Sequence, residues 1–240
     1  MKTHAHAALG KVCEQADGQT KLARHALTKG DQAEEKRMVR NTIAGWLAAA
    51  ALAIAAASAH GAIPGGVDLS GHSVQQLAPA GTKAVVLFFV ASDCPISNRY
   101  IPEIEKLNAE FGPHGVLFWW IYPNPGDTAA VVKMHDAQFA LPSDTLAHTL
   151  LDAKQSLASM AHVTITPEAA VFVPNGSGLR EVYRGRIDNR YIDFGQERPS
   201  ATQHDLEEAI RAVLDRKTVP PPGGPPVGCS IVTTGVASHP

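Results

Sequence analysis

Two continuous apolar runs mark the middle of the chain, residues 83–90 and 115–122, and both are rich in β-branched and aromatic side chains. Runs of this length and composition predict strands that are buried on both faces. Between them, residues 95–111 repeat apolar side chains every three to four positions, with charged residues in between. That spacing predicts an amphipathic helix, which Gly112-Pro113 ends.

Polar and turn-forming residues divide the rest of the central block into further elements. Asp127 is placed to cap a helix that runs to about residue 139, and Asn175-Gly176 is a strong hairpin signal. The other expected elements are a short hairpin over 67–77, a strand over 149–152, a helix over 153–161, hairpin strands over 168–174 and 179–186, and a last helix over 203–216 capped by Thr202. This order predicts an α/β fold, a three-layer sandwich with a mixed central sheet flanked by helices.

The first 59 residues differ from the central block. Residues 1–37 are polar and without pattern, and residues 38–59 place a basic head before an Ala-rich apolar stretch that ends in small residues. This is the layout of a secretory signal peptide. We therefore interpret 1–37 as a non-native extension, Met38 as the true start and His60 as the approximate start of the mature chain. The alternative is an uncleaved membrane anchor through residues 42–59.

Both interpretations predict an exported protein, periplasmic or otherwise outside the cytoplasm. We expect one domain over residues 60–217, followed by a Pro/Gly-rich tail over 218–240. The net charge is −2 without a long basic run, so no nucleic-acid partner is expected. Cys13 lies in the N-terminal extension, which leaves Cys94 and Cys229. An even number of cysteines in an oxidising compartment suggests a pair.

Cys94 stands where the first apolar run gives way to the predicted helix. A thiol there lies beside unpaired backbone N–H groups at the positive end of the helix dipole, and both favour the thiolate. The thiolate is the form that attacks disulfides and peroxides. The alternative is a buried structural thiol, or one half of an inert disulfide.

This order of elements, with a cysteine at the first strand-to-helix corner, resembles the thioredoxin-like superfamily. The extra strand and helix between 115 and 161 are similar to its redoxin branch, which includes peroxiredoxin-like (AhpC/TSA-like) proteins. The nearest resemblance is to exported redoxin-domain proteins that carry Asp-Cys-Pro-Ile-Ser-Asn, Tyr-Arg-Gly-Arg-Ile-Asp and Gly-Cys-Ser-Ile, which here are residues 93–98, 183–188 and 228–231.

The resemblance implies roles for several residues. Cys94 is the nucleophile, and Thr166 with Pro167 forms a cis-proline loop that faces the sulfur and presents backbone atoms to the substrate. Arg186 follows a strand beside that loop, where its guanidinium would stabilise the thiolate; the alternative is a surface arginine paired with Asp188 or Glu181. Ser97 replaces the second cysteine of thioredoxin. Its hydroxyl would donate a hydrogen bond to the thiolate, but a local resolving thiol is absent.

Cys229 is the candidate resolving cysteine. It lies twelve residues beyond Lys217, and at ~3.1 Å per residue the tail covers about 37 Å. The central block has an expected radius of gyration of about 15 Å. The tail is therefore long enough for Cys229 to reach Cys94, and a permanent or transient bond, a terminal staple and a free thiol all stay open.

The leading hypothesis is an exported thiol–disulfide oxidoreductase that acts on oxidised or reduced protein thiols without a cofactor or bound metal. A peroxiredoxin-like peroxidase is the second, although Ala91 stands where that family carries the threonine that holds the peroxide. The third is a non-catalytic module with a structural Cys94–Cys229 disulfide. A copper carrier that uses Cys94 and the histidines is disfavoured, because none of them has the close spacing of a metal motif; these histidines are His135, His148 and His162.

Overall fold

The computed structural model describes residues 65–233, while 1–64 and 234–240 lie outside the described part of the chain. The predicted signal peptide or anchor therefore lies outside the described residues, as does Cys13. Within residues 65–233, none of the helices combines the length and the apolar character that crossing a bilayer demands.

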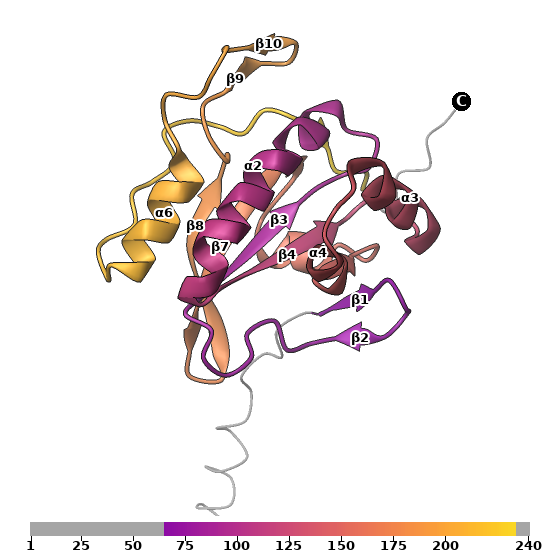
Figure 1. Ribbon diagram of the computed structural model, residues 1–240, viewed down its shortest axis with the longest axis horizontal. Helices are drawn as coiled ribbons and strands as arrows, with labels where there is room; N and C mark the ends of the chain where they lie inside the picture. The colour runs from indigo at the N-terminus through magenta and orange to yellow at the C-terminus, as the bar shows by residue number, and fades with distance from the viewer. Residues whose placement is uncertain (1–64, 234–240) are drawn as a thin grey trace, which may run out of the picture. The chain divides into compact units, whose positions relative to one another are not determined.

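The centre of the domain is a seven-stranded mixed sheet in the order β2-β1-β5-β4-β3-β7-β8 (Figure 1). β3 lies parallel to β4 and antiparallel to β7, which confirms the predicted mixed sheet. The strands are β1 (Gly66–Asp68), β2 (Ser73–Val74), β3 (Ala84–Phe89), β4 (Val116–Tyr122), β5 (Thr149–Leu151), β7 (Glu168–Asn175) and β8 (Gly178–Gly185).

Helices cover both faces of the sheet, so the predicted three-layer sandwich is confirmed. The helices are α2 (Pro95–Phe111), the 3-10 turn η1 (Gly112–His114), α3 (Ala129–Phe139), α4 (Ser143–Ala147), α5 (Ser156–Met160) and α6 (Asp205–Leu214). Two small antiparallel sheets complete the described part, β9 (Tyr191–Asp193) with β10 (Gln196–Glu197), and β6 (Ile165–Thr166) with β11 (Cys229–Ser230).

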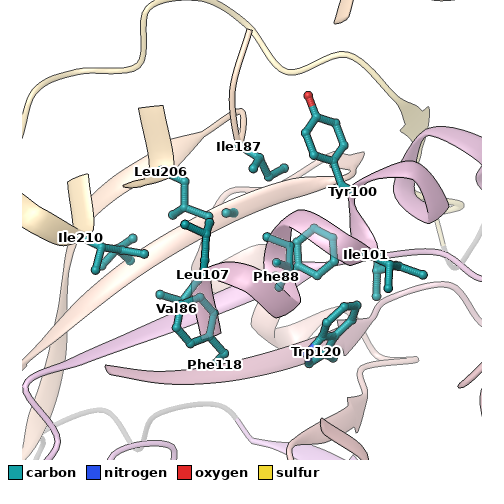
Figure 2. Packing of buried hydrophobic residues seen from close by; sticks show 14 of the residues in the cluster. Val86, Phe88, Tyr100, Ile101, Leu107, Phe118, Trp120, Ile187, Leu206 and Ile210 are labelled. Carbon is teal, nitrogen blue, oxygen red and sulfur yellow. The ribbon is translucent and has the colours of Figure 1, made fainter. Parts of the chain in front are cut away.

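The alternation of side chains along the strands divides the core into two layers. Val86 and Phe88 of β3 pack in the layer under α2 and α6, while Leu87 packs in the layer under α5. Figure 2 shows the first layer, in which α6 contributes apolar side chains beside those of α2 and the sheet. The adjacent residues Trp119 and Trp120 belong to different layers, as period-two alternation predicts.

The predicted helix caps differ from the observed ones. Thr128, and not Asp127, caps α3, because its side chain accepts a hydrogen bond from the Val131 N–H. The residue before α6 is His204, which makes no side-chain cap bond, while Thr202 instead accepts a hydrogen bond from Asn189. The predicted strands and helices are otherwise present within a few residues of their expected bounds, but the β9–β10 hairpin, α4 and the β6–β11 pair were not expected.

Candidate redox site

Cys94 is the N-cap residue of α2, at the corner that follows β3. Its backbone is extended, with φ −87° and ψ 112°, and its carbonyl oxygen accepts the Asn98 N–H at 3.0 Å, the first bond of the helix. Pro95 is the first helical residue, and the first turn carries no acidic side chain. The unpaired N–H groups and the positive end of the dipole therefore lie at the cysteine without an opposing carboxylate in that turn.

The cis-proline loop faces the sulfur, as the resemblance implied. The peptide bond between Thr166 and Pro167 is cis, and the Thr166 carbonyl oxygen lies 3.3 Å from Cys94 Sγ. When Cys94 is a thiol, this oxygen is positioned to accept its proton. Such a bond favours the neutral thiol and opposes the effect of the helix dipole.

A disulfide joins Cys94 to Cys229 across 135 positions of the sequence. The two Cα atoms are 6.1 Å apart, which is within the usual range for disulfides. Only 1% of the Cys94 surface is exposed, whereas Cys229 is half-buried. The pairing that the cysteine count suggested is therefore present, and Cys229 is the member of the pair that is more open to solvent.

The tail that carries Cys229 binds the cis-proline loop as a short strand. β11 runs antiparallel to β6 with Cys229 opposite Thr166, and the Ile231 N–H donates to the Thr164 carbonyl at 2.9 Å. The tail backbone approaches the loop so closely that a Cβ atom on Gly228 would lie 2.1 Å from the Thr166 carbonyl oxygen. The residue before Cys229 must therefore lack a side chain.

Contacts before and after the β6–β11 pair also hold the tail against the domain. Its Val227 packs against the core layer under α2, and Ile231 belongs to the opposite layer. The Val232 N–H donates to Asn124 Oδ1 at 2.9 Å, and the Gln155 side-chain amide donates to the Val232 carbonyl. In Figure 1 the yellow C-terminal segment runs from α6 past the end of the sheet where β3 meets α2.

Arg186 pairs with Asp205, and not with the predicted alternatives Asp188 or Glu181. Its Nε donates to Asp205 Oδ2 at 2.9 Å, and its terminal nitrogen donates to Gln203 Oε1 at 2.7 Å. The hydrogen bonds of the described residues include none between Arg186 and Cys94, so the predicted effect of this guanidinium on the thiolate stays a prediction.

Ser97 is fully buried in the first turn of α2, and its hydroxyl oxygen accepts the Ala91 N–H at 3.5 Å. This contact ties the helix start to the end of the preceding strand. Among the described hydrogen bonds there is none between Ser97 and Cys94, whose sulfur is engaged in the disulfide. The proposed bond from the Ser97 hydroxyl to a Cys94 thiolate stays a prediction for the reduced protein.

Asp127, which was expected to cap a helix, has its carboxylate beside the loop that precedes Cys94 instead. Oδ1 accepts hydrogen bonds from both the hydroxyl and the backbone N–H of Ser92. Burial raises the pKa of Asp127, and the bonds from Ser92 act against that rise. Its Oδ2 is buried and has no hydrogen-bond partner among the described groups. No local pattern distinguishes this role from a cap, because Ser92 lies 35 residues away.

His135 is a buried histidine with satisfied ring nitrogens. Nδ1 lies 3.0 Å from the Tyr122 hydroxyl, and Nε2 lies 2.8 Å from Asn98 Oδ1. Asn98 in turn donates to the Ser92 carbonyl, which connects the histidine to the loop before Cys94. Burial raises the pKa of Tyr122. These contacts are those of a histidine whose ring nitrogens are hydrogen-bonded within the core.

Glu168 directly follows Pro167 and was not predicted as a site residue. It is the first residue of β7, only 5% exposed, and burial raises its pKa to about 7. The signal in the sequence is a lone acidic residue at the head of an apolar strand. A carboxyl that titrates near neutrality beside the cis-proline loop is a candidate proton donor and acceptor.

One group of three metal-ligating side chains occurs among the described residues, formed by Glu103, His204 and Glu207. Glu103 already pairs with Lys106, and Glu207 pairs with Arg211. The group contains neither Cys94 nor the three histidines of the copper hypothesis. The donor set for that hypothesis is therefore not assembled in the described part of the chain.

A hollow of about 260 Å³ lies next to the Cys94 corner. Pro95 and Ile96 form one wall, and residues of the β9–β10 hairpin form the other, including Tyr191 and Phe194. Phe194 is 63% exposed, although it is a large apolar side chain. The hollow therefore has an exposed apolar side chain in its wall.

Comparisons with known proteins agree with this geometry. Residues 63–177 match the model of the AhpC/TSA family. Among solved structures, an uncharacterized conserved protein from Geobacillus kaustophilus is 24% identical, covering 73% of this chain and 92% of that chain with a TM-score of 0.56. A hypothetical protein from Sinorhizobium meliloti is 22% identical, covering 72% and 92%, with a TM-score of 0.58. These two likenesses show the fold alone, and a search of curated proteins found no match.

A mixed sheet, a cysteine at the start of its first long helix and a facing cis-proline define the thioredoxin-fold class of oxidoreductases. Together with the match of residues 63–177 to the AhpC/TSA family, they support a thioredoxin-like redoxin-domain protein. The Cys94–Cys229 disulfide and the family match support a redox function that involves thiols or peroxides.

Proposed function

We propose that the protein is an exported thiol–disulfide oxidoreductase in which Cys94 is the nucleophile and Cys229 is the resolving thiol. The observation that carries the proposal is the disulfide between a helix N-cap cysteine and a cysteine on a docked tail. The helix start favours the thiolate of Cys94, and the tail supplies the second thiol that the corner lacks.

The exchange proceeds in two displacements. The Cys94 thiolate attacks one sulfur of a substrate disulfide, forms a mixed disulfide and expels the other sulfur as a thiolate, which takes up a proton. The Cys229 thiolate then attacks Cys94 Sγ, expels the remaining substrate thiolate and closes the Cys94–Cys229 bond. The substrate disulfide is reduced to two thiols, and the dithiol of the protein is oxidised.

A reducing partner regenerates the dithiol by attacking the more accessible sulfur, that of Cys229. Two features favour attack at the sulfur of Cys229. Cys94 is almost fully buried while Cys229 is not, and the helix start makes Cys94 the better leaving thiolate. The partner's thiolate therefore becomes linked to Cys229, and its second thiol displaces Cys229 while the partner is oxidised.

Thr166 and Pro167 would present backbone atoms to the cysteine-bearing segment of a polypeptide substrate. In the oxidised protein this edge is paired with the protein's own tail. We infer that the tail leaves the edge of β6 before Cys94 attacks a protein disulfide. In that open form, the Ser97 hydroxyl would donate a hydrogen bond to the thiolate.

A peroxidase is the second candidate, and the AhpC/TSA match favours it. Here the Cys94 thiolate attacks a hydroperoxide, becomes a sulfenic acid and releases an alcohol or water. Cys229 then condenses with the sulfenic acid, releasing water and forming the same disulfide. Ala91, which stands in place of the peroxide-holding threonine, is fully buried and offers no hydroxyl.

Trapping tests the exchange reaction. Cys229→Ser expressed in the exported compartment is expected to accumulate proteins disulfide-linked to Cys94, whereas Cys94→Ser is the matched control that should accumulate none of these adducts. Stopped-flow mixing with hydrogen peroxide separates the two candidates. Rapid oxidation of Cys94 by peroxide, without adducts in the trapping experiment, would replace the oxidoreductase proposal with the peroxidase.

The non-catalytic alternative is a Cys94–Cys229 disulfide that only holds the tail in place. A titration of the native protein against thiol redox buffers decides this case. A reduction potential below about −300 mV is typical of a structural disulfide, whereas an exchanging pair is expected above that value.

Export is inferred from the sequence pattern of residues 38–59. We infer that translation starts at Met38, that 1–37 is a non-native extension and that the mature chain consists of the domain over 60–217 and the tail over 218–240. N-terminal sequencing of the mature protein is expected to begin near His60. Recovery of peptides from residues 1–37 would contradict a start at Met38. An uncleaved 42–59 segment in the membrane fraction would favour the membrane anchor.

A further inference from the structure

The middle of the tail binds to a buried ion pair. The Arg186 and Asp205 side chains are 13% and 7% exposed. While Asp205 Oδ2 accepts the Arg186 Nε–H, Asp205 Oδ1 accepts the backbone N–H of Gly223 at 2.5 Å. The Arg186–Asp205 pair therefore connects the end of β8 and the start of α6 to one point of the tail.

The tail glycines at this point are in close contact with the guanidinium. A Cβ atom on Gly223 or on Gly224 would lie 2.7 Å from a terminal nitrogen of Arg186. One residue earlier, Pro222 packs so closely on Gly185 that a Cβ atom there would lie 2.7 Å from the proline ring. Two glycines in the tail and one at the end of β8 are thus the small residues that let the backbone and guanidinium approach.

We propose that Arg186 is a positioning residue for Cys229, a role that rests on the proposed resolving function of that cysteine. Its contacts with Asp205 and Gly223 are made by groups outside the disulfide, so they persist when the Cys94–Cys229 bond is reduced. The tail is then held at Gly224 while the segment beyond it detaches from β6 and returns. Cys94 becomes accessible to a substrate without the loss of its resolving thiol.

The length of free chain gives the size of this effect. When loss of the Arg186–Asp205 pair also releases Val219 and Pro222 from the domain, the free segment runs from Lys217 to Cys229, which is twelve residues; with the pair it runs from Gly224 to Cys229, which is five. The local concentration of a tethered group falls roughly as the −3/2 power of tether length. Shortening from twelve to five residues therefore raises the concentration of Cys229 at Cys94 about fourfold.

The test compares Arg186→Gln with Arg180→Gln, an exposed arginine on the same strand β8. Each full-length protein is equilibrated with reduced and oxidised glutathione, and the ratio of closed to open Cys94–Cys229 pairs gives the effective concentration of the two thiols. Arg186→Gln is expected to lower it about fourfold, and Arg180→Gln is expected to leave it unchanged. An unchanged value in Arg186→Gln, or an equal fall in the control, would overturn the positioning role.

The same pair of variants in a Cys229→Ser background separates positioning from a direct effect on the thiolate. The pH dependence of Cys94 alkylation is expected to be the same with and without Arg186→Gln, because no tail thiol remains to be positioned. A shift of the titration midpoint toward higher pH would overturn the positioning role and show that the guanidinium acts on Cys94 itself.

A variant on the tail side separates loss of the tail contact from misfolding caused by Arg186→Gln. Gly224→Ala keeps both side chains of the Arg186–Asp205 pair but would bring a Cβ atom within 2.7 Å of the guanidinium, so the tail and the guanidinium must separate. It is expected to lower the effective concentration as Arg186→Gln does, with an unchanged melting temperature; no fall would count against the role. The glutathione equilibrium needs no natural substrate, so failure of the oxidoreductase proposal appears separately, as the absence of adducts on Cys94 in the trapping experiment.

Discussion

Cys229 lies directly opposite Thr166 in the β6–β11 pair, and the Thr166 carbonyl oxygen lies 3.3 Å from the sulfur of Cys94. The disulfide joins this part of the tail to the start of α2, and the backbone pairing joins the same part of the tail to the neighbouring cis-proline loop. Any change that separates the strands also separates the sulfurs, and reduction of the disulfide weakens the strand pairing. This coupling makes the redox state and the position of the tail parts of one equilibrium.

Gly228→Ala is predicted to disturb this coupling from the tail side. The new Cβ atom would lie 2.1 Å from the Thr166 carbonyl oxygen, so the backbone must move. A forced shift of this kind costs about 1–3 kcal/mol, which lowers the effective concentration of the two thiols by roughly 5- to 150-fold. The glutathione equilibrium measures this change in effective concentration. Gly178→Ala, where the nearest atom is 3.8 Å away, is the control, and equal behaviour of the two variants would contradict the prediction.

Cys229→Ser cannot form the disulfide and is predicted to be less stable than the oxidised wild type. The disulfide closes a loop of 135 residues, and loss of a cross-link over a long loop costs about 3–5 kcal/mol. Unfolding in urea should show this loss against the wild type without reductant. With reductant present, wild type and variant should have nearly equal stability. A large difference that survives reduction would mean that the serine disturbs the folded state directly.

The main elements of the fold could be predicted because their signals are local. The apolar run over 84–89 is buried on both faces, and α2 spans the predicted residues because its apolar positions repeat at helical spacing up to Gly112. The cysteine at the N-cap could also be located, since it lies at the boundary of these two patterns. Predictions of this kind need no knowledge of distant contacts.

The surroundings of Cys94 could not be predicted in the same way, because they depend on pairs far apart in the chain. Asp205 lies 19 residues from Arg186, and Asp127 lies 35 residues from Ser92. The candidates that sequence reasoning offered for Arg186 were nearer along the chain. Gly223 and Gly224 were assigned only to the Pro/Gly-rich tail, and Gly228 only to the Gly-Cys-Ser-Ile motif. Their lack of a side chain is required by close packing against folded elements, which the local sequence does not show.

Phe194→Ala is predicted to slow exchange with protein disulfides and to leave the rate of exchange with oxidised glutathione unchanged. Phe194 lines the hollow beside Pro95 and is largely exposed, so an apolar side chain of a bound polypeptide can cover it. Loss of such a contact costs about 1–2 kcal/mol, or roughly tenfold in rate at low substrate concentration. The measurement is kcat/KM with a reporter protein disulfide and with glutathione disulfide.

Met134→Ala is the matched control for that experiment. Met134 is 68% exposed on α3 and is not part of the hollow. It is expected to leave both rates unchanged. A parallel fall with both substrates in Phe194→Ala would mean that the change acts on the Cys94 corner rather than on the contact with the polypeptide.

Glu168→Gln is predicted to flatten the pH dependence of stability. Burial raises the pKa of Glu168 from 4.5 to about 7, so between these values the folded protein holds a proton that the unfolded chain releases. The stability from this group is therefore fully present below about pH 4.5, falls as pH rises and levels off above about 7, with a total loss of at most about 3 kcal/mol. Urea unfolding at pH 5 and pH 8 measures the loss. Glutamine cannot ionise, so the variant should lose less stability than the wild type between these pH values, and equal losses in the two proteins would show that the carboxyl ionises normally in the fold.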